Sequence, residues 1–398
     1  MLSKLIIYGV FQGLIVVVSL LTMIYVTKHV SPSEYAIYGV FLSIAALFQP
    51  LASFSCERLV QVKKHSLSND KYQVFIGELI ALTAISSFII AFLCFIYFSL
   101  FSTQATTLLI GIFVAFRSLK SFKLFEYNIE NRTIKYGLVG LSVKVLAFIF
   151  IYVFFEVYSA NANYLILSIF IAEVSISLLI NNNRVIPFRT INKAQFKPFL
   201  KFGLPLVIAT IPAWIAHDSG RVILDRFSSA EAGILTFGLQ LAGVYMLFNS
   251  ALGNAVVKDV YLAYESRSLG KVILKITSLQ VLVSILFMTV FHYSGDLFLD
   301  EKFISVNECF YYLVLGFLIQ SFSLVPVYLA SYDGKTKFVL KANAFAALAF
   351  IFYVLLCLEA ITAVTIAQGF LFSMLTYSTV LWFQYFNSAS TFTSINKS

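Results

Sequence analysis

Charged residues are scarce in this chain. Asp, Glu, Lys and Arg make up only 12% of its 398 residues, roughly half of their usual share in soluble domains, which is about 25%. No stretch is polar enough for a water-soluble domain, and no connection between apolar segments exceeds about 20 residues. An enzyme that polymerises or ligates lipid-linked sugars would be expected to carry a sizeable outer loop, and the sequence offers none.

Cysteine is also rare, and the four cysteines stand singly in or near apolar segments. Without CxxC or another metal-ligand spacing, we expect no disulfide, no metal site and no cofactor. Gly334-Lys335-Thr336 resembles the end of a phosphate-binding loop, but Leu329 stands where that loop needs glycine. The sequence also lacks HExxH and the nucleophile elbow, so we expect a protein that is not an enzyme.

Apolar residues, in contrast, are abundant: they form 60% of the chain, with 42 Phe. About 20 consecutive apolar residues cross the hydrocarbon core of a bilayer, and we identify twelve such segments, called spans 1 to 12. The spans cover residues 5–27, 35–56, 75–98, 104–123, 138–157, 164–182, 199–226, 232–255, 272–294, 310–331, 338–358 and 361–385. The predicted fold is an all-α integral membrane protein with about 12 transmembrane helices in two pseudo-symmetric six-helix lobes.

Basic residues fall mostly on one side of these spans. If each span crosses the membrane, 23 of the 28 Lys and Arg lie on the side of the N-terminus, four lie opposite, and Lys144 lies within span 5. Short loops rich in Lys and Arg stay in the cytoplasm, so both termini are expected to be cytoplasmic. The net charge of +9 then reflects topology, and we expect no nucleic-acid partner.

An internal repeat is indicated by sliding the sequence on itself by 197 residues. Val30–Ile37 then falls on Phe227–Ile234, at corresponding helical hairpins of the two halves. Six spans in each half keep the same orientation, which makes a parallel repeat about an axis along the membrane normal. We therefore expect lobes at 1–190 and 191–398, joined by a basic cytoplasmic connector at about 183–201.

Ionisable residues within spans are costly and are the best candidates for function. Lys144 in span 5 and Glu173 in span 6 lie at similar depth, within about 5 Å, at 1.5 Å rise per residue. They are expected either to form a structural ion pair, with snorkelling of Lys144 as a variant, or to face a cavity. In the cavity interpretation Lys144 attracts an anionic substrate and Glu173 carries a proton or cation.

Span 7 places a second charged group near its outer end. Asp218 and Arg221 are three residues apart and Arg221 and Asp225 are four apart, so all three share one helix face. The group is either a self-neutralising helix end at the interface or the lining of a central cavity, with Arg221 binding an anion. Pro205 and Pro212 should bend this span.

The remaining candidates line the inner mouth or interrupt apolar spans. Basic groups at the inner ends of spans 1, 2 and 8 suit capture of a phosphate-bearing headgroup, although any positive-inside loop contains such groups. Polar groups within spans either hydrogen-bond between helices or face sugar hydroxyls. The basic candidates are Lys4, Arg58 and Lys258, and the polar ones are Gln12, Gln240 and Asn249.

With twelve spans in two similar halves, the chain resembles the Wzx-type polysaccharide flippases of the multidrug/oligosaccharidyl-lipid/polysaccharide exporter superfamily. Local stretches that carry the resemblance are Ser31–Tyr38 with Pro50–Arg58, Lys201–Leu206, and Trp214–Phe227 with Glu231–Gly233. These patterns are loose and include no catalytic signature.

The resemblance implies a flippase of the bacterial inner membrane. It would move an undecaprenyl-pyrophosphate-linked oligosaccharide, such as an O-antigen unit of lipopolysaccharide, from the cytoplasmic to the periplasmic leaflet by alternating access. Cavity cations would neutralise the pyrophosphate, and Glu173, Asp218 and Asp225 are the hypothesised ion-coupling residues. Expected partners are membrane lipids, a polysaccharide polymerase and a chain-length regulator. The alternatives are an ion-coupled drug or cation antiporter of the same superfamily and a polysaccharide polymerase.

Overall fold

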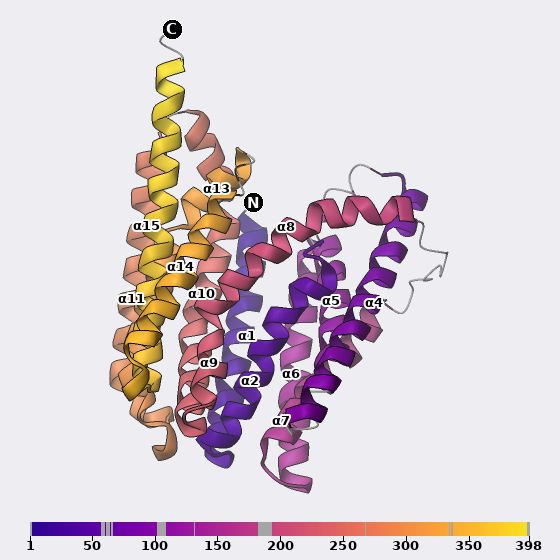
Figure 1. Ribbon diagram of the computed structural model, residues 1–398, viewed down its shortest axis with the longest axis vertical. Helices are drawn as coiled ribbons and strands as arrows, with labels where there is room; N and C mark the ends of the chain where they lie inside the picture. The colour runs from indigo at the N-terminus through magenta and orange to yellow at the C-terminus, as the bar shows by residue number, and fades with distance from the viewer. Residues whose placement is uncertain are drawn as a thin grey trace. The chain divides into compact units, whose positions relative to one another are not determined.

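The computed structural model describes residues 2–56, 60, 64, 67–101, 109–130, 132–181, 193–266, 268–333, 335 and 337–395. Within these residues the chain is helical and contains no strand (Figure 1). Two short 3₁₀ helices, Glu301–Phe303 and Leu358–Ala360, join longer ones. The prediction of an all-helical membrane protein is confirmed.

Each predicted span corresponds to one long helix or to a broken pair. The helices are α1 (Leu2–His29), α2 (Pro32–Ser53), α4 (Asn69–Phe101), α5 (Leu109–Ile129), α6 (Thr133–Val157), α7 (Ala162–Asn181), α8 (Lys193–His217), α9 (Ser219–Asp225), α10 (Ser229–Glu265), α11 (Leu269–Phe298), α12 (Val306–Ser321), α13 (Leu324–Tyr332), α14 (Lys337–Leu356) and α15 (Ala363–Ile395). Span 7 is α8 followed by α9, and span 10 is α12 followed by α13.

Ten stretches of the described residues are helical, long and apolar enough to cross a membrane. The helices of spans 4 and 7 are not among them. In span 7 the described apolar stretch, Leu206–His217, is short. In span 4, α5 carries Arg117, Lys120, Lys123 and Glu126 within little more than two turns. A helix with so many charges is unusual within a bundle of apolar helices. Because buried charges in a membrane are costly, α5 is the strongest candidate for a functional helix.

The chain divides into two compact units. Unit 1 is Met1–Val30 with Ile37–Ile211, and unit 2 is Ser31–Ala36 with Pro212–Ser398. The division falls inside α8, which continues through Pro205 and Pro212 and is interrupted only at Asp218. The predicted boundary at 190 and the connector at 183–201 stay predictions, since residues 182–192 lie outside the described part of the chain.

In unit 1 the first helix packs along α6. Gly137 of α6 faces Phe11 of α1 so closely that a Cβ would overlap the ring, and Tyr25 donates to a carboxylate oxygen of Glu156 at 3.2 Å. Residue numbers rise in the same direction on both helices, so α1 and α6 run parallel, as the predicted alternation of spans requires. Glycine at this contact lets the two helices approach closely.

In unit 2 the most extensive packing joins α15 to α12 and α14, and Figure 1 shows α14 and α15 side by side. The short segment Ser31–Ala36 also belongs to this unit. Tyr35 is 2% exposed, donates to Gln240 Oε1 at 2.7 Å and meets Phe237 edge-on. Gly233 lies against the carbonyl of Pro32 with no room for a side chain.

The two stretches matched by the internal repeat fold alike. Ser31 precedes α2 and accepts a hydrogen bond from the Glu34 amide at 3.3 Å, and Ser228 precedes α10 and accepts one from Glu231 at 3.4 Å. Ser at the N-cap with Glu three residues later is the capping-box sequence, in which the Ser side chain satisfies a free amide of the first turn. The repeated sequence therefore has a repeated local role, as a helix start.

Candidate functional site

Helices α5 and α7 of unit 1 are joined by a buried ion pair. Lys120 Nζ lies 2.6 Å from Glu173 Oε1 and 2.8 Å from Oε2, and the two side chains are 14% and 5% exposed. Ser177 reinforces the contact by donating to the Phe116 carbonyl at 2.9 Å. Of the alternatives expected for Lys144 and Glu173, the ion pair between them is therefore wrong. Similar depth fixes only the position along each helix, whereas packing of α5 on α7 decides which cation faces the carboxylate.

Lys144 and Arg117 complete a cluster of cations around this pair. Lys144 is exposed on α6 and lies within electrostatic range of Arg117, Lys120 and Glu173. Arg117 is partly exposed, with its guanidinium 5.9 Å from the centre of the Phe113 ring. We call Arg117, Lys120 and Lys144 the basic cluster. Among the described residues, Glu173 is the one carboxylate that pairs with a member of it.

Helix periodicity explains why Arg117 and Lys120 lie together, since they are three residues apart and therefore share a face of α5. Lys144 comes from another helix, α6, and lies seven residues beyond Gly137, on the face turned toward Phe11 of α1. Three cations against one carboxylate leave an excess of positive charge within a helical membrane unit. Such an excess is costly unless a ligand or water offsets it, and an anion with several oxygens is the chemistry that it suits.

The charged group of span 7 forms only part of the predicted network. Arg221 is largely buried and pairs with Asp218 at 3.0 Å, as predicted for residues three apart. The expected second pair is absent: Arg221 Nε and Asp225 Oδ1 both lack a hydrogen-bond partner among the described residues. The helix is interrupted at Asp218, which places Arg221 and Asp225 on the separate short helix α9. Four-residue spacing on a helix permits an ion pair but does not impose it.

The other predicted residues have separate surroundings. Gln240 binds Tyr35, Gln12 is half-buried on α1 with an unpartnered Oε1, and Asn249 is buried on α10 beside a cavity. Arg58 and the side chains of Lys4 and Lys258 lie outside the described residues, so their roles stay predictions.

Sequence reasoning missed Arg117 and Lys120 as site residues. Both were counted only among the basic residues on the side of the N-terminus, although their spacing on one face of span 4 was a usable signal.

Comparison with known proteins decides the family. A family model described as "Polysaccharide biosynthesis protein" matches residues 1–258, which is more than half of the chain. The chain belongs to this family. The predicted resemblance to polysaccharide exporters is thereby confirmed at the level of the family. No curated protein matches the sequence.

Solved structures show that this polysaccharide biosynthesis protein has a transporter fold. It is similar to a lipid II flippase, MurJ, in an inward closed conformation, with a TM-score of 0.75, 12% identity, and coverage of 96% of this chain and 87% of that one. An inward-facing multidrug resistance MATE transporter gives a TM-score of 0.66 at 12% identity, covering 98% and 99%. A mutant of the Vibrio cholerae MATE transporter VcmN gives 0.55 at 13%, covering 98% and 94%. The fold is that of a multi-pass membrane transporter with about 12 transmembrane helices.

Proposed function

We propose that the protein is a flippase for a polyprenyl-pyrophosphate-linked oligosaccharide, such as an O-antigen repeat unit. It moves the lipid-linked unit from the cytoplasmic to the periplasmic leaflet of a bacterial inner membrane by alternating access. The polysaccharide family, the transporter fold and the excess of cations in unit 1 support this proposal. The single observation that carries it is the basic cluster.

The basic cluster has the chemistry that a pyrophosphate needs. Lys120 is already neutralised by Glu173, whereas Arg117 and Lys144 have no ion pair among the described residues. Arginine can bind two phosphate oxygens with its planar fork, and lysine adds a mobile point charge. In the proposed mechanism Arg117 and Lys144 hold the pyrophosphate, and the polyprenyl tail stays in the bilayer.

A drug or cation antiporter fits these residues less well. Such a transporter carries a cationic substrate, which the excess positive charge of the basic cluster would repel. A polymerase is disfavoured because the described connections at the outer ends of the helices are short, residues 299–305 being the longest of them.

We further propose that Glu173 couples transport to an ion gradient, with Asp218 and Asp225 as the second candidate group. Protonation of Glu173 would release Lys120 and add a third free cation to the cluster, which strengthens the hold on pyrophosphate. Moving one charge across the membrane is worth about 2.3 kcal/mol per 100 mV, enough to bias such a cycle. A polysaccharide polymerase and a chain-length regulator remain proposed partners.

Complementation tests this proposal. The gene is expressed in a bacterium that lacks its own O-unit flippase, and surface polysaccharide is measured together with the lipid-linked units that accumulate in the membrane. We expect surface polymer to return and the intermediate to fall. Lys144→Ala and Arg117→Ala should each reduce the recovery about tenfold or more, since a charge-assisted hydrogen bond contributes about 1.5–3 kcal/mol.

Lys135→Ala is the matched control. Lys135 is an exposed lysine of the same helix α6, nine residues before Lys144, and is not among the groups that act on Lys144. It should support full recovery. If the wild-type chain is expressed with a matching oligosaccharide and restores nothing, or if Lys144→Ala and Lys135→Ala behave alike, the proposal fails.

A further inference from the structure

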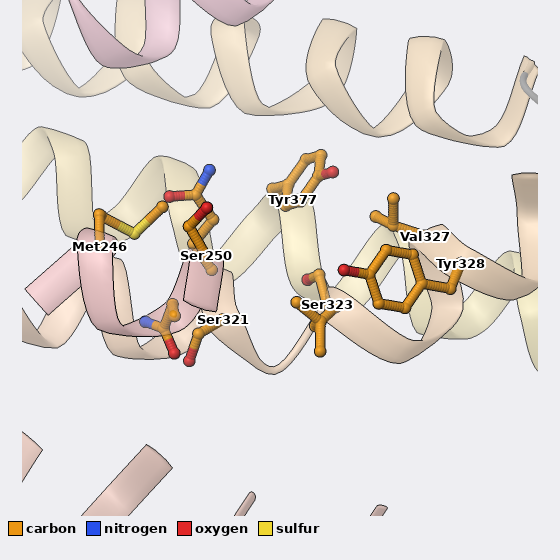
Figure 2. Close-up of a pocket in the computed structure, with 10 residues that line it drawn as sticks. Met246, Ser250, Ser321, Ser323, Val327, Tyr328 and Tyr377 are labelled. Atoms are coloured by element: carbon orange, nitrogen blue, oxygen red, sulfur yellow. The ribbon is translucent and has the colours of Figure 1, made fainter. Parts of the chain in front are cut away.

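Unit 2 contains an uncharged cavity, mostly apolar with a few polar groups, that the basic cluster does not involve. It has a volume of about 210 Å³ and lies between α10, the α12–α13 pair and α15 (Figure 2). Amide, hydroxyl and aromatic side chains line it, among them Asn249, Gln320, Tyr328 and Tyr377, and none of the lining residues is charged. Figure 2 shows the Tyr328 hydroxyl directed toward Ser323.

Two amides of this cavity keep polar atoms without a hydrogen-bond partner among the described residues. Asn249 is only 3% exposed, and although it lies near the Tyr245 hydroxyl, neither of its polar atoms makes a hydrogen bond of normal geometry within the described part of the chain. Gln320 lies 3.3 Å from His217 through its Nε2, but its Oε1 has no partner among the described residues. Buried polar groups are nearly always hydrogen-bonded to protein, water or a ligand, so these amide atoms are available to a polar group that enters the cavity.

The cavity lies beside a broken helix. Pro326 has no N–H to donate to the Phe322 carbonyl one turn earlier, and its ring would clash with that carbonyl, so span 10 breaks into α12 and α13. The indole of Trp382 on α15 donates to the Phe322 carbonyl instead, at 3.2 Å. Backbone groups freed at membrane depth must find such partners.

Other side chains satisfy the neighbouring carbonyls. Gln280 of α11 donates to the Ser321 carbonyl at 3.1 Å, and Ser378 of α15 donates to the Ile319 carbonyl at 2.7 Å. These carbonyls are therefore already occupied by donors. No carboxylate is among the described residues that line the cavity, so a divalent cation would find only neutral oxygen ligands there.

We infer that this cavity is a subsite for one uncharged sugar residue of the transported oligosaccharide, an inference that rests on the proposed function. An amide both donates and accepts, which matches the neighbouring hydroxyls of a sugar ring. Tyrosine offers an apolar ring beside a polar hydroxyl, which suits a ring with both C–H and O–H groups. The volume is below the roughly 300–1,000 Å³ of drug-sized sites and suits a single sugar residue.

A glycine of α10 fixes the shape of this subsite. A Cβ on Gly253 would lie 2.5 Å from the Tyr328 hydroxyl, so Gly253 leaves room for the tyrosine to reach the cavity. Gly253→Ala should displace Tyr328 and weaken sugar recognition without removing a polar group. It is a second variant, independent of Asn249.

Binding measurements with two lipids distinguish the role of the subsite from that of the basic cluster. Purified protein in nanodiscs is titrated with the lipid-linked oligosaccharide of the host and, separately, with undecaprenyl pyrophosphate that carries no sugar. We expect the wild type to bind the sugar-bearing lipid about tenfold or more tightly. Asn249→Leu should remove most of this preference and leave the affinity for undecaprenyl pyrophosphate unchanged. Lys144→Ala should weaken the binding of both lipids.

Gln384→Leu is the control for Asn249→Leu. Gln384 is an amide of α15 that also has an unpartnered oxygen among the described residues but does not line the cavity, and its replacement should keep the preference. If Asn249→Leu and Gly253→Ala fold and keep the full preference for the sugar-bearing lipid, the subsite is refuted while the proposed function stands. If the wild type binds neither lipid, both are refuted.

Discussion

Replacing Lys120 should destabilise the protein strongly, whereas replacing Lys144 should not. Lys120 lies 2.6 and 2.8 Å from the two oxygens of Glu173, whose side chain is 5% exposed. Lys120→Ala leaves that carboxylate buried without its cation, a change that costs about 3–5 kcal/mol. Lys144 forms no ion pair among the described residues and faces other cations, so Lys144→Ala leaves no partner without its charge and should cost far less stability than Lys120→Ala.

Thermal unfolding of the purified variants in one detergent measures this contrast, with Lys135→Ala as the exposed reference. Adding Glu173→Gln to Lys120→Ala removes the stranded charge, so the double variant should regain a large part of the lost stability. The reasoning is refuted if Lys120→Ala unfolds at the same temperature as Lys144→Ala, or if Glu173→Gln gives the Lys120→Ala protein no recovery.

Three further predictions concern packing and pH. Gly233→Ala should lower thermal stability, because a Cβ would overlap the Pro32 carbonyl; an unchanged melting temperature would contradict the close approach. Trp382→Phe should cost about 1–3 kcal/mol in denaturant unfolding, because the Phe322 carbonyl loses its donor. Burial and a neighbouring carboxylate raise the pKa of Tyr264 above its ordinary value of 10.0, so its neutral form is favoured in the folded protein. The stability this provides is present below about pH 10 and is lost above it, and Tyr264→Phe should flatten that loss in melting curves measured from about pH 9 to 12.

Much of the fold follows from the sequence because membrane spans carry a strong signal in length and hydropathy. All twelve predicted spans coincide with helices. The break in span 10 was not predicted, although Pro326 indicates it once its missing donor is considered. Helix α5 was predicted as a span, but its basic residues were used only to orient the chain in the membrane and not as candidates for a site.

The site was only partly predictable, because a sequence pattern gives the depth of a residue in the membrane but not the neighbouring helix that its side chain faces. Lys144 and Glu173 were recognised as intramembrane charges, but Lys120 was found as the partner of Glu173 only through the packing of α5 on α7. Asn249 was recognised as a polar residue within an apolar span. Its unsatisfied amide and the cavity beside it depend on neighbours such as Gln320 and Tyr377, which are far away in sequence and which no local pattern encodes.

The most direct test of the proposed function is lipid translocation by the purified protein. The wild type, Lys144→Ala and Lys135→Ala are reconstituted into liposomes that contain the lipid-linked oligosaccharide. A glycan-oxidising reagent that cannot cross the bilayer then measures how much oligosaccharide reaches the outer leaflet. We predict that the wild type and Lys135→Ala expose the inner-leaflet fraction within the assay, and that Lys144→Ala does so at least about tenfold more slowly. If the wild-type protein leaves the inner fraction as protected as empty liposomes do, the flippase account is wrong.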